Sequence, residues 1–230
     1  MKLKILLPVL GFLLIICTSA QSQKSFAILR GGVNFANVST TSDGRIDDAN
    51  MLTSLQAGII GNVHIAPFFN FQPGILFTGK GSKTQSGSTN DATYFRATSN
   101  PWYIEIPVNF VFRSPGPLKF FAGAGPYIAM GFAGKNTTDG KYLGVAFHSE
   151  KNIKWSNDDP TTLNYEEGSG FGIMKRFDYG LNGTAGIETK TAVLSANYGL
   201  GLAKLQSGSN SSADDNNKHR VLSFTIGFKL

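Results

Sequence analysis

The sequence predicts an all-β protein: an eight-stranded antiparallel up-and-down transmembrane β-barrel with long extracellular loops and short periplasmic turns. The first observation behind this prediction is the alternation of apolar and polar residues, which is clearest in WYIEIPVNFVF at Trp102–Phe112. Successive side chains of a strand point to opposite faces, so this stretch has one continuous apolar face and one mostly polar face. The second observation is that the connections between such stretches alternate between long and short, which is typical of barrels that span a membrane.

Eight stretches show this alternation. In chain order they are predicted at Phe26–Val38, Leu52–Ala66, Asn70–Lys80, Trp102–Phe112, Phe120–Phe132, Arg176–Glu188, Ala192–Leu205 and His219–Leu230. One outward apolar residue from each strand in turn is Leu29, Ile59, Phe77, Phe110, Ile128, Leu181, Leu194 and Phe224. Strands of soluble proteins have about 5–6 residues, whereas a tilted membrane strand needs about 9–11. The length of these stretches therefore favours the membrane barrel over a soluble barrel or sandwich, which is the alternative fold.

The connections complete this prediction. The long ones are residues 39–51, 81–100, 134–172 and 206–218, and the short ones are residues 66–69, 114–117 and 189–191. Within the longest loop, the partly apolar piece Tyr142–Phe147 is expected to extend a hairpin beyond the membrane. Pro73, Pro107 and Pro126 lie inside predicted strands, where each removes a backbone donor, so local bulges are expected there.

The amino-terminal residues have the layout of a secretory signal peptide. Lys2 and Lys4 precede an apolar run from Ile5 to Cys17, and Thr18-Ser19-Ala20 supplies small residues for cleavage after Ala20. The run is shorter than the roughly 20 apolar residues that a membrane-spanning helix needs. The domains are therefore predicted as a cleaved signal peptide at 1–20 and an outer-membrane barrel at 21–230.

The composition excludes several classes of function. The only cysteine is removed with the signal peptide, which rules out disulfides and cysteine-based metal sites in the mature chain. The net charge of +6 is small, and its basic residues are scattered, which argues against nucleic-acid binding.

The inward faces of the strands are the candidate functional region. An eight-stranded barrel is just wide enough for its own side chains to fill, so a plugged polar lumen is predicted. The predicted lumen network is Arg30, Gln56, Tyr103, Glu105, Asn109, Arg176, Asp178, Asn182 and Glu188. Because buried charges must be paired, Glu105 is expected to pair with Arg30 or Arg176. A gated path for solutes is the alternative interpretation.

Catalytic and metal sites receive little support. The histidines His64, His148 and His219 are far apart, and no HExxH motif or other ligand spacing occurs. Asp178 or Asp214 beside His219 is the only dyad that the pattern suggests, and solvated or lumenal polar residues explain it better. The acidic groups Asp43/Asp47/Asp48, Asp158/Asp159 and Asp214/Asp215 lack a full calcium-loop motif. No catalytic residue, cofactor or metal is predicted.

Several segments together carry a family resemblance. They are FQPGILFTGKG at Phe71–Gly81, WYIEIPVNFVF, FFAGAGPYIAMG at Phe120–Gly131, FDYGLNGTAGIE at Phe177–Glu188 and NYGLGLAKL at Asn197–Leu205. In this order and spacing the chain resembles the PorT-like family of outer-membrane β-barrel proteins. The resemblance implies an eight-stranded barrel in the outer membrane of a gram-negative bacterium. The founding member of that family is associated with a protein secretion system.

The carboxy terminus resembles the signal that the barrel-insertion machinery reads. Gly227, Phe228 and Leu230 are the residues that match, although that signal usually ends in an aromatic residue. The expected partners are therefore outer-membrane lipid, the insertion machinery and other envelope or secretion proteins. The function expected from the sequence is a non-enzymatic barrel whose extracellular loops contact partners or surface material, or support secretion or envelope integrity. A small porin-like channel and a rim-located outer-membrane enzyme are the alternatives.

Overall fold

A computed structural model describes residues 25–39, 49–157, 173–205 and 217–230. The predicted signal peptide lies outside these residues. The strands are β1 (Phe26–Ser39), β2 (Ala49–Asn50), β3 (Leu52–Ala66), β4 (Phe69–Gly79), β5 (Ser82–Ser86), β6 (Tyr94–Arg113), β7 (Lys119–Tyr142), β8 (Val145–Asn152), β9 (Lys154–Trp155), β10 (Ile173–Met174), β11 (Phe177–Glu188), β12 (Ala192–Gly201) and β13 (Lys218–Lys229).

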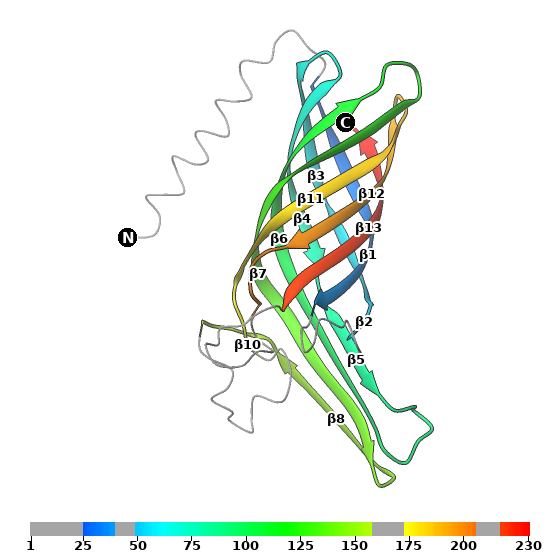
Figure 1. Ribbon diagram of the computed structural model, residues 1–230, viewed down its shortest axis with the longest axis vertical. Helices are drawn as coiled ribbons and strands as arrows, with labels where there is room; N and C mark the ends of the chain where they lie inside the picture. Colours follow the sequence, from blue (N-terminus) through cyan, green and yellow to red (C-terminus); the bar gives the residue numbers. More distant parts are fainter. Residues whose placement is uncertain (1–24, 40–48, 158–172, 206–216) are drawn as a thin grey trace.

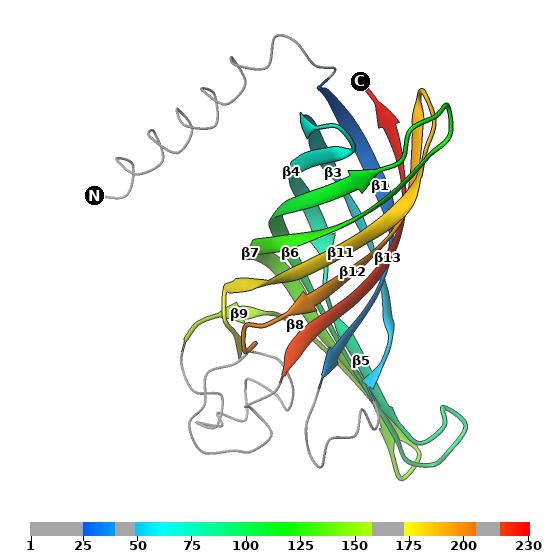
Figure 2. The same cartoon turned by 45° about the horizontal axis from the view of Figure 1, so that its top comes forward.

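Eight long strands form a closed ring (Figure 1). Their order around the ring is β1, β3, β4, β6, β7, β11, β12 and β13, and β13 pairs with β1 to close it. Every pairing within the ring is antiparallel and joins strands that are consecutive in this order. The predicted eight-stranded up-and-down barrel is therefore confirmed. Figure 2 shows that the strands are strongly tilted relative to the long axis of the barrel.

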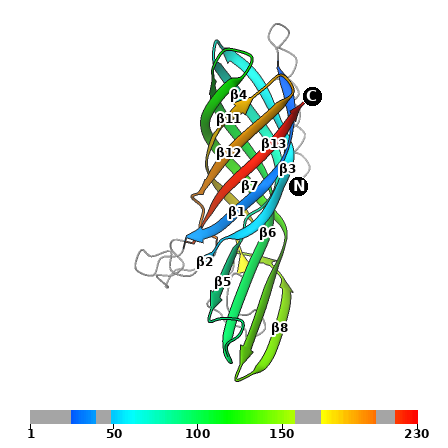
Figure 3. The same ribbon diagram turned by 90° about the vertical axis from the view of Figure 1, so that its right-hand side faces the viewer.

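The two ends of the barrel differ. The short turns and the last residue, Leu230, lie at one end, and the long connections lie at the other (Figures 1 and 3). In membrane barrels the short turns are periplasmic and the long connections extracellular. The ends are named accordingly below.

The two faces of the barrel wall carry different side chains, as the alternation predicts. Outward residues such as Phe120, Ile128 and Phe177 are 62%, 61% and 68% exposed, whereas inward Asn34 and Tyr103 are fully buried. An apolar outer surface of this kind is stable against lipid, and the backbone groups of the ring are satisfied by its own ladder. Glycine is needed where strands crowd inside: a Cβ at Gly125 would collide with the backbone of Val108.

Two connections that were predicted as loops are partly sheet. Residues 81–100 contain β5 and the first part of β6, and residues 134–172 contain the end of β7 and all of β8. The predicted extension of the hairpin at Tyr142–Phe147 is confirmed, but it is longer than expected. We call β5, Tyr94–Asn100 of β6, Lys135–Tyr142 of β7 and β8 the protruding sheet. It continues beyond the extracellular end, roughly along the barrel axis (Figures 1 and 3).

The predicted bulges at the prolines are wrong. The ladder misses pairs beside Pro73 and Pro107, but the register is the same on both sides of each gap, and Pro126 lies within a continuous ladder with β11. A missing donor is thus tolerated without an inserted residue. The register shifts instead between Trp102 and Tyr103 and between His64 and Ala66.

Candidate functional site

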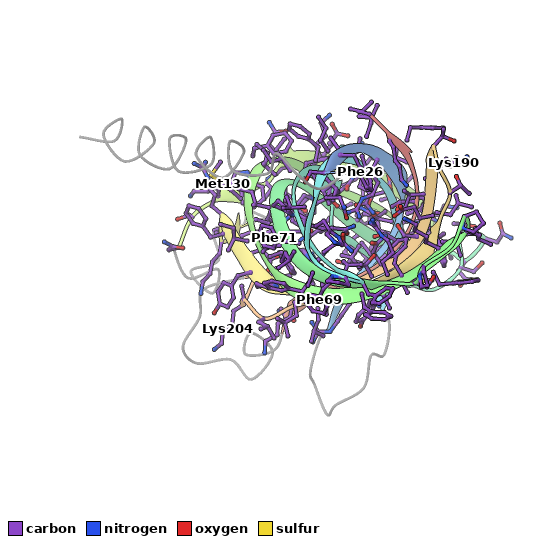
Figure 4. All side chains as sticks on the ribbon, turned by 90° about the horizontal axis from the view of Figure 1, so that it is seen from above. Phe26, Phe69, Phe71, Met130, Lys190 and Lys204 are labelled. Carbon is purple, nitrogen blue, oxygen red and sulfur yellow. The ribbon has the colours of Figure 1, made fainter. Side chains whose placement is uncertain are left out.

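The interior of the barrel is filled with side chains rather than open (Figure 4). Two small cavities lined by described lumen residues have volumes of about 30 and 20 Å³. A cavity of this size holds one or two water molecules at most. The lumen therefore contains isolated pockets, and its contents fall into layers along the axis.

A three-charge cluster lies in the extracellular half of the lumen. The Lys80 Nζ atom is 2.7 Å from Glu105 Oε2 and 2.9 Å from Asp178 Oδ2, and all three side chains are buried. The hydroxyl of Tyr127 donates to the same Asp178 oxygen at 3.0 Å, and Asn182 donates to Glu105 Oε1 at 3.2 Å. The ammonium also lies 3.9 Å from the centroid of the Tyr127 ring, a cation–π contact. Each charge therefore has an opposite charge and a neutral partner.

A histidine and a tyrosine lie beside this cluster. His219 Nε2 lies 3.2 Å from the hydroxyl oxygen of Tyr103, and both side chains are buried. The other ring nitrogen of His219 has no hydrogen-bond partner among the described residues. Asp178, which the sequence suggested as a dyad partner, instead binds Lys80 and Tyr127.

A second ionic cluster lies at the periplasmic end. Glu188 accepts from Arg113 Nη2 at 2.9 Å through one oxygen and from Lys229 Nζ through the other. The ring of Phe26 lies against both cations. The same Arg113 nitrogen also donates to Asn62 Oδ1 at 2.7 Å. This cluster links the first and last strands of the ring, β1 and β13, to the periplasmic ends of β6 and β11.

An apolar layer separates the two ionic clusters. It consists of Ile28, Ile60, Leu76, Val111, Phe121 and Val193, which contact one another inside the barrel. Gln72, Thr184 and Ser195 line the smaller cavity together with residues of this layer, so polar groups also lie at its height. Arg30 lies beside it, lines both cavities and donates to Asn197 Oδ1 at 3.4 Å.

The extracellular mouth of the lumen is covered by a lid, which we define as Ile153, Trp155, Met174 and Leu205. Ile153, Met174 and Leu205 are buried and pack on Val38. The Trp155 ring contacts Tyr103 edge to face, with centroids 5.7 Å apart, and lies on Gly131. A backbone hydrogen bond from Ile153 to Gly134 of β7 holds the lid to the barrel, and another from Lys175 to Leu205 joins two segments of the lid.

The protruding sheet presents a second kind of surface. On one face, Lys135 pairs with Glu150 and His148 with Asp139, each at 2.6 Å across β7 and β8. The hydrogen bond from Lys135, together with its charge, lowers the pKa of the Glu150 carboxyl. These pairs are well exposed and contribute little to stability.

The tip of the protruding sheet is apolar and exposed. Tyr142, Leu143 and Val145 are 65%, 75% and 72% exposed, and Phe147 is 44% exposed. Leu143 and Gly144 both have positive φ, which is the geometry of a tight two-residue hairpin turn. A rigid apolar tip in water, away from the lipid-facing wall, is characteristic of an interaction surface.

The structure places the predicted lumen residues as follows. Gln56, Tyr103, Glu105, Asn109, Asp178 and Glu188 are buried inside the barrel, and Arg30 and Asn182 line its larger cavity. Arg176 does not join them, because the chain bends just before β11 and leaves its side chain exposed. Glu105 is paired with Lys80, so the expected pairing with Arg30 or Arg176 is wrong.

Several functional residues were missed from the sequence. Lys80 falls on the polar face of the third predicted strand with Thr78, but it was not included in the predicted lumen network; it lies just after β4 and is buried. Tyr127 shares its inward face with Gly123 and Gly125, so that face did not look polar. The lid residues have no periodic pattern from which they could have been found.

Other predicted sites give a mixed result. Gly227 and Phe228 lie in the last strand and Leu230 follows it, which leaves their part in insertion a prediction. Asp43, Asp47, Asp48, Asp158, Asp159, Asp214 and Asp215 lie outside the described residues. Within the described ranges, no group of three or more His, Cys, Asp or Glu side chains is placed to hold a metal ion. No helix in the described part of the chain is long and apolar enough to cross a membrane.

Comparisons with solved structures found similar barrels. The attachment invasion locus protein Ail of Yersinia pestis is 12% identical, with 90% of this chain and 100% of that chain covered and a TM-score of 0.41. Neisserial surface protein A is 12% identical, with 90% and 99% covered and a TM-score of 0.39. OprG of Pseudomonas aeruginosa is 10% identical, with 90% and 95% covered and a TM-score of 0.42. A comparison with curated protein sequences found no match.

A family comparison identifies the chain. Residues 20–207 match the family described as outer membrane protein beta-barrel domain, which is most of the sequence. The match spans β1 to β12 of the ring and the protruding sheet. The chain therefore belongs to the outer membrane protein beta-barrel domain family and is a β-barrel of the outer membrane of a gram-negative bacterium.

Proposed function

We propose that this protein is a non-enzymatic binding protein of the outer membrane, with a closed barrel as its anchor and the protruding sheet as its contact surface. The observation that carries the proposal is the exposed apolar tip at Tyr142–Phe147, held outside the membrane by strands that continue directly from the barrel wall. A patch of this kind on a rigid support is costly in water unless a partner covers it.

The lumen supports an anchoring role rather than transport. The side chains packed in the lumen, which leave described cavities of only about 30 and 20 Å³, and the lid over its mouth each interrupt a path for solutes. The buried ion pairs hold inward side chains in one arrangement and favour a rigid wall. The porin-like alternative requires both the lumen side chains and the lid to move.

The partner class is narrowed by the family resemblance. The chain resembles PorT-like proteins in its sequence motifs, and the founding member of that family is associated with a protein secretion system of this membrane. We infer a partner in the cell envelope or at its surface, with the insertion machinery and outer-membrane lipid as contacts that every such barrel makes.

A shortened variant tests the proposal. Replacing Thr137–Glu150 by Asn-Gly removes the tip and most of β8, while Asn136 and Lys151 remain paired and the lid residues stay in place. Cross-linking in intact cells, followed by purification, is expected to recover partners with the wild-type protein and to lose them with this variant. Equal recovery from both proteins would contradict the proposal.

Conductance in planar bilayers tests the closed lumen separately. The wild-type protein is expected to give no stable single-channel steps. Regular steps would instead establish the porin-like alternative. Folding is checked by the shift in electrophoretic mobility on heating. The wild-type protein and the shortened variant should both show this shift.

A further inference from the structure

The outer edge of β8 has no partner strand among the described residues. β8 pairs with β7 on one side and ends the order of strands in the main sheet. In a two-residue hairpin the residues next to the turn, Tyr142 and Val145, bond to each other, so the next residue of β8 directs its backbone away from β7. Ala146, His148, Glu150 and Asn152 therefore present their N–H and C=O groups at the open edge.

The half of this edge near the tip lacks the usual protection. Natural edge strands are blunted by charges, proline or bulges. The charged residues of β8, Glu150 and Lys151, lie in its second half, and His148 and Glu150 are engaged with β7. The first three residues, Val145–Phe147, include no charged residue, proline or bulge.

An apolar patch lies beside this edge on one face. Across three strands Phe95, Gly140 and Phe147 are aligned, and the Phe147 ring lies over Gly140. Val145 continues this face toward the turn and is 72% exposed. A strand placed next to β8 would bring every second side chain onto this patch.

We propose that the β8 edge binds an extended polypeptide segment of a partner protein as an additional antiparallel strand. The segment has alternating apolar and polar residues, with its apolar side chains on Val145 and Phe147. Main-chain hydrogen bonds supply affinity and the apolar contacts supply register, as in other cases of strand addition. This inference rests on the proposed function and specifies its partner.

Two other occupants fit less well. The protruding sheet runs roughly along the barrel axis (Figure 3), so a second copy in the same membrane would be related by a twofold axis close to the β8 direction. The two β8 strands would then be parallel, and the apolar face of one would continue into the polar face of the other. A lipid surface would cover the apolar tip but would leave the edge backbone groups unbonded, which is costly in hydrocarbon.

The probe for this inference is an acetylated peptide, Thr-Val-Thr-Val-Thr-Val-Thr-Lys, with a fluorophore on its lysine. Binding to the full-length protein in lipid nanodiscs is measured by fluorescence anisotropy. The site is mapped by amide hydrogen exchange. The peptide is expected to slow exchange at Ala146, His148 and Glu150, whose N–H groups face the edge, with little change at the odd-numbered residues between them.

The discriminating variant is Ala146→Pro. Proline at this position removes an outward N–H and keeps the pairing with β7, because edge strands tolerate proline there. We expect about tenfold weaker peptide binding, since one hydrogen bond is lost and its partner is left unmatched. The control Ala97→Ser alters the same face in β6, away from the β8 edge, and should bind as the wild type does.

The outcomes separate this inference from the proposed function. Unchanged binding by Ala146→Pro, or slowed exchange at odd and even residues alike, would overturn the β8 edge as the site. Binding of protein-free phosphatidylethanolamine vesicles in place of the peptide would overturn it in favour of a membrane. Dimers in nanodiscs that Ala146→Pro dissociates would overturn it in favour of a second copy. If Ala146→Pro still recovers envelope partners in the cross-linking experiment and the shortened variant does not, this inference is refuted and the proposed function stands.

Discussion

Removing the charge of Lys80 should be among the most damaging single substitutions in the barrel. Lys80→Met keeps the length of the side chain and deletes the one cation that contacts both Glu105 and Asp178. Two charge-assisted hydrogen bonds are lost, and each is worth about 1.5–3 kcal/mol. The expected loss of unfolding free energy is therefore about 3–6 kcal/mol, close to the cost of breaking a buried ion pair from one side.

The neutral partners of the carboxylates limit this loss. Asp178 keeps the hydroxyl of Tyr127, and Glu105 keeps the amide of Asn182. A variant that also carries Glu105→Gln and Asp178→Asn leaves no unpaired charge, so most of the lost stability should return. This rescue distinguishes an electrostatic cause from a packing defect at Lys80.

The measurement is equilibrium unfolding by guanidinium chloride in lipid vesicles, followed by tryptophan fluorescence and by the mobility shift on heating. Lys83→Met is the matched control, because Lys83 lies on the protruding sheet and its loss should change stability by no more than about 0.5 kcal/mol. If Lys80→Met unfolds at the same denaturant concentration as the wild type, the buried cluster does not stabilise the barrel and the reasoning fails.

Three further predictions concern the ends of the molecule. Glu188→Gln should cost about 3 kcal/mol in the same unfolding assay, because it leaves the two cations of the periplasmic cluster without a carboxylate. Gly131→Val should push the Trp155 ring out of the lid, and in a Trp102→Phe background this appears as a red shift of the remaining tryptophan emission; an unchanged spectrum would contradict the lid geometry. Leu230→Phe should raise the fraction of newly made protein that becomes heat-modifiable, whereas equal fractions would argue against a terminal insertion signal.

The fold was predictable because lipid imposes a simple rule on each strand. Every outward side chain meets hydrocarbon, so a one-residue error in any strand would place polar groups there. The pattern from Leu29 to Phe228 therefore predicts the inward and outward faces, and the loop lengths predict the topology. The protruding sheet was underestimated because its strands meet water on both faces, where alternation carries less information.

The ion pairing was not predictable for a geometrical reason. Parity shows that Arg30, Lys80 and Glu105 all point inward, but their heights in the lumen depend on how far each strand is shifted against the next. That shift brings Lys80 from the end of β4 to Glu105 of β6 and Asp178 of β11. The prediction that Arg176 points into the lumen was wrong for a local reason. The chain bends at Arg176, before β11 begins, so its side chain does not follow the alternation of that strand.

The contrast between the barrel and the protruding sheet points to function. Inside the membrane, β6 and β7 close the ring, so no strand edge is left in hydrocarbon, where unbonded backbone is costly. Beyond the membrane the same two strands continue and end in an open sheet bounded by β8. Water can satisfy this edge in the free protein, but its uncharged first three residues are also open to another strand. Stability of the barrel does not require an uncharged edge there, whereas binding of a partner strand does.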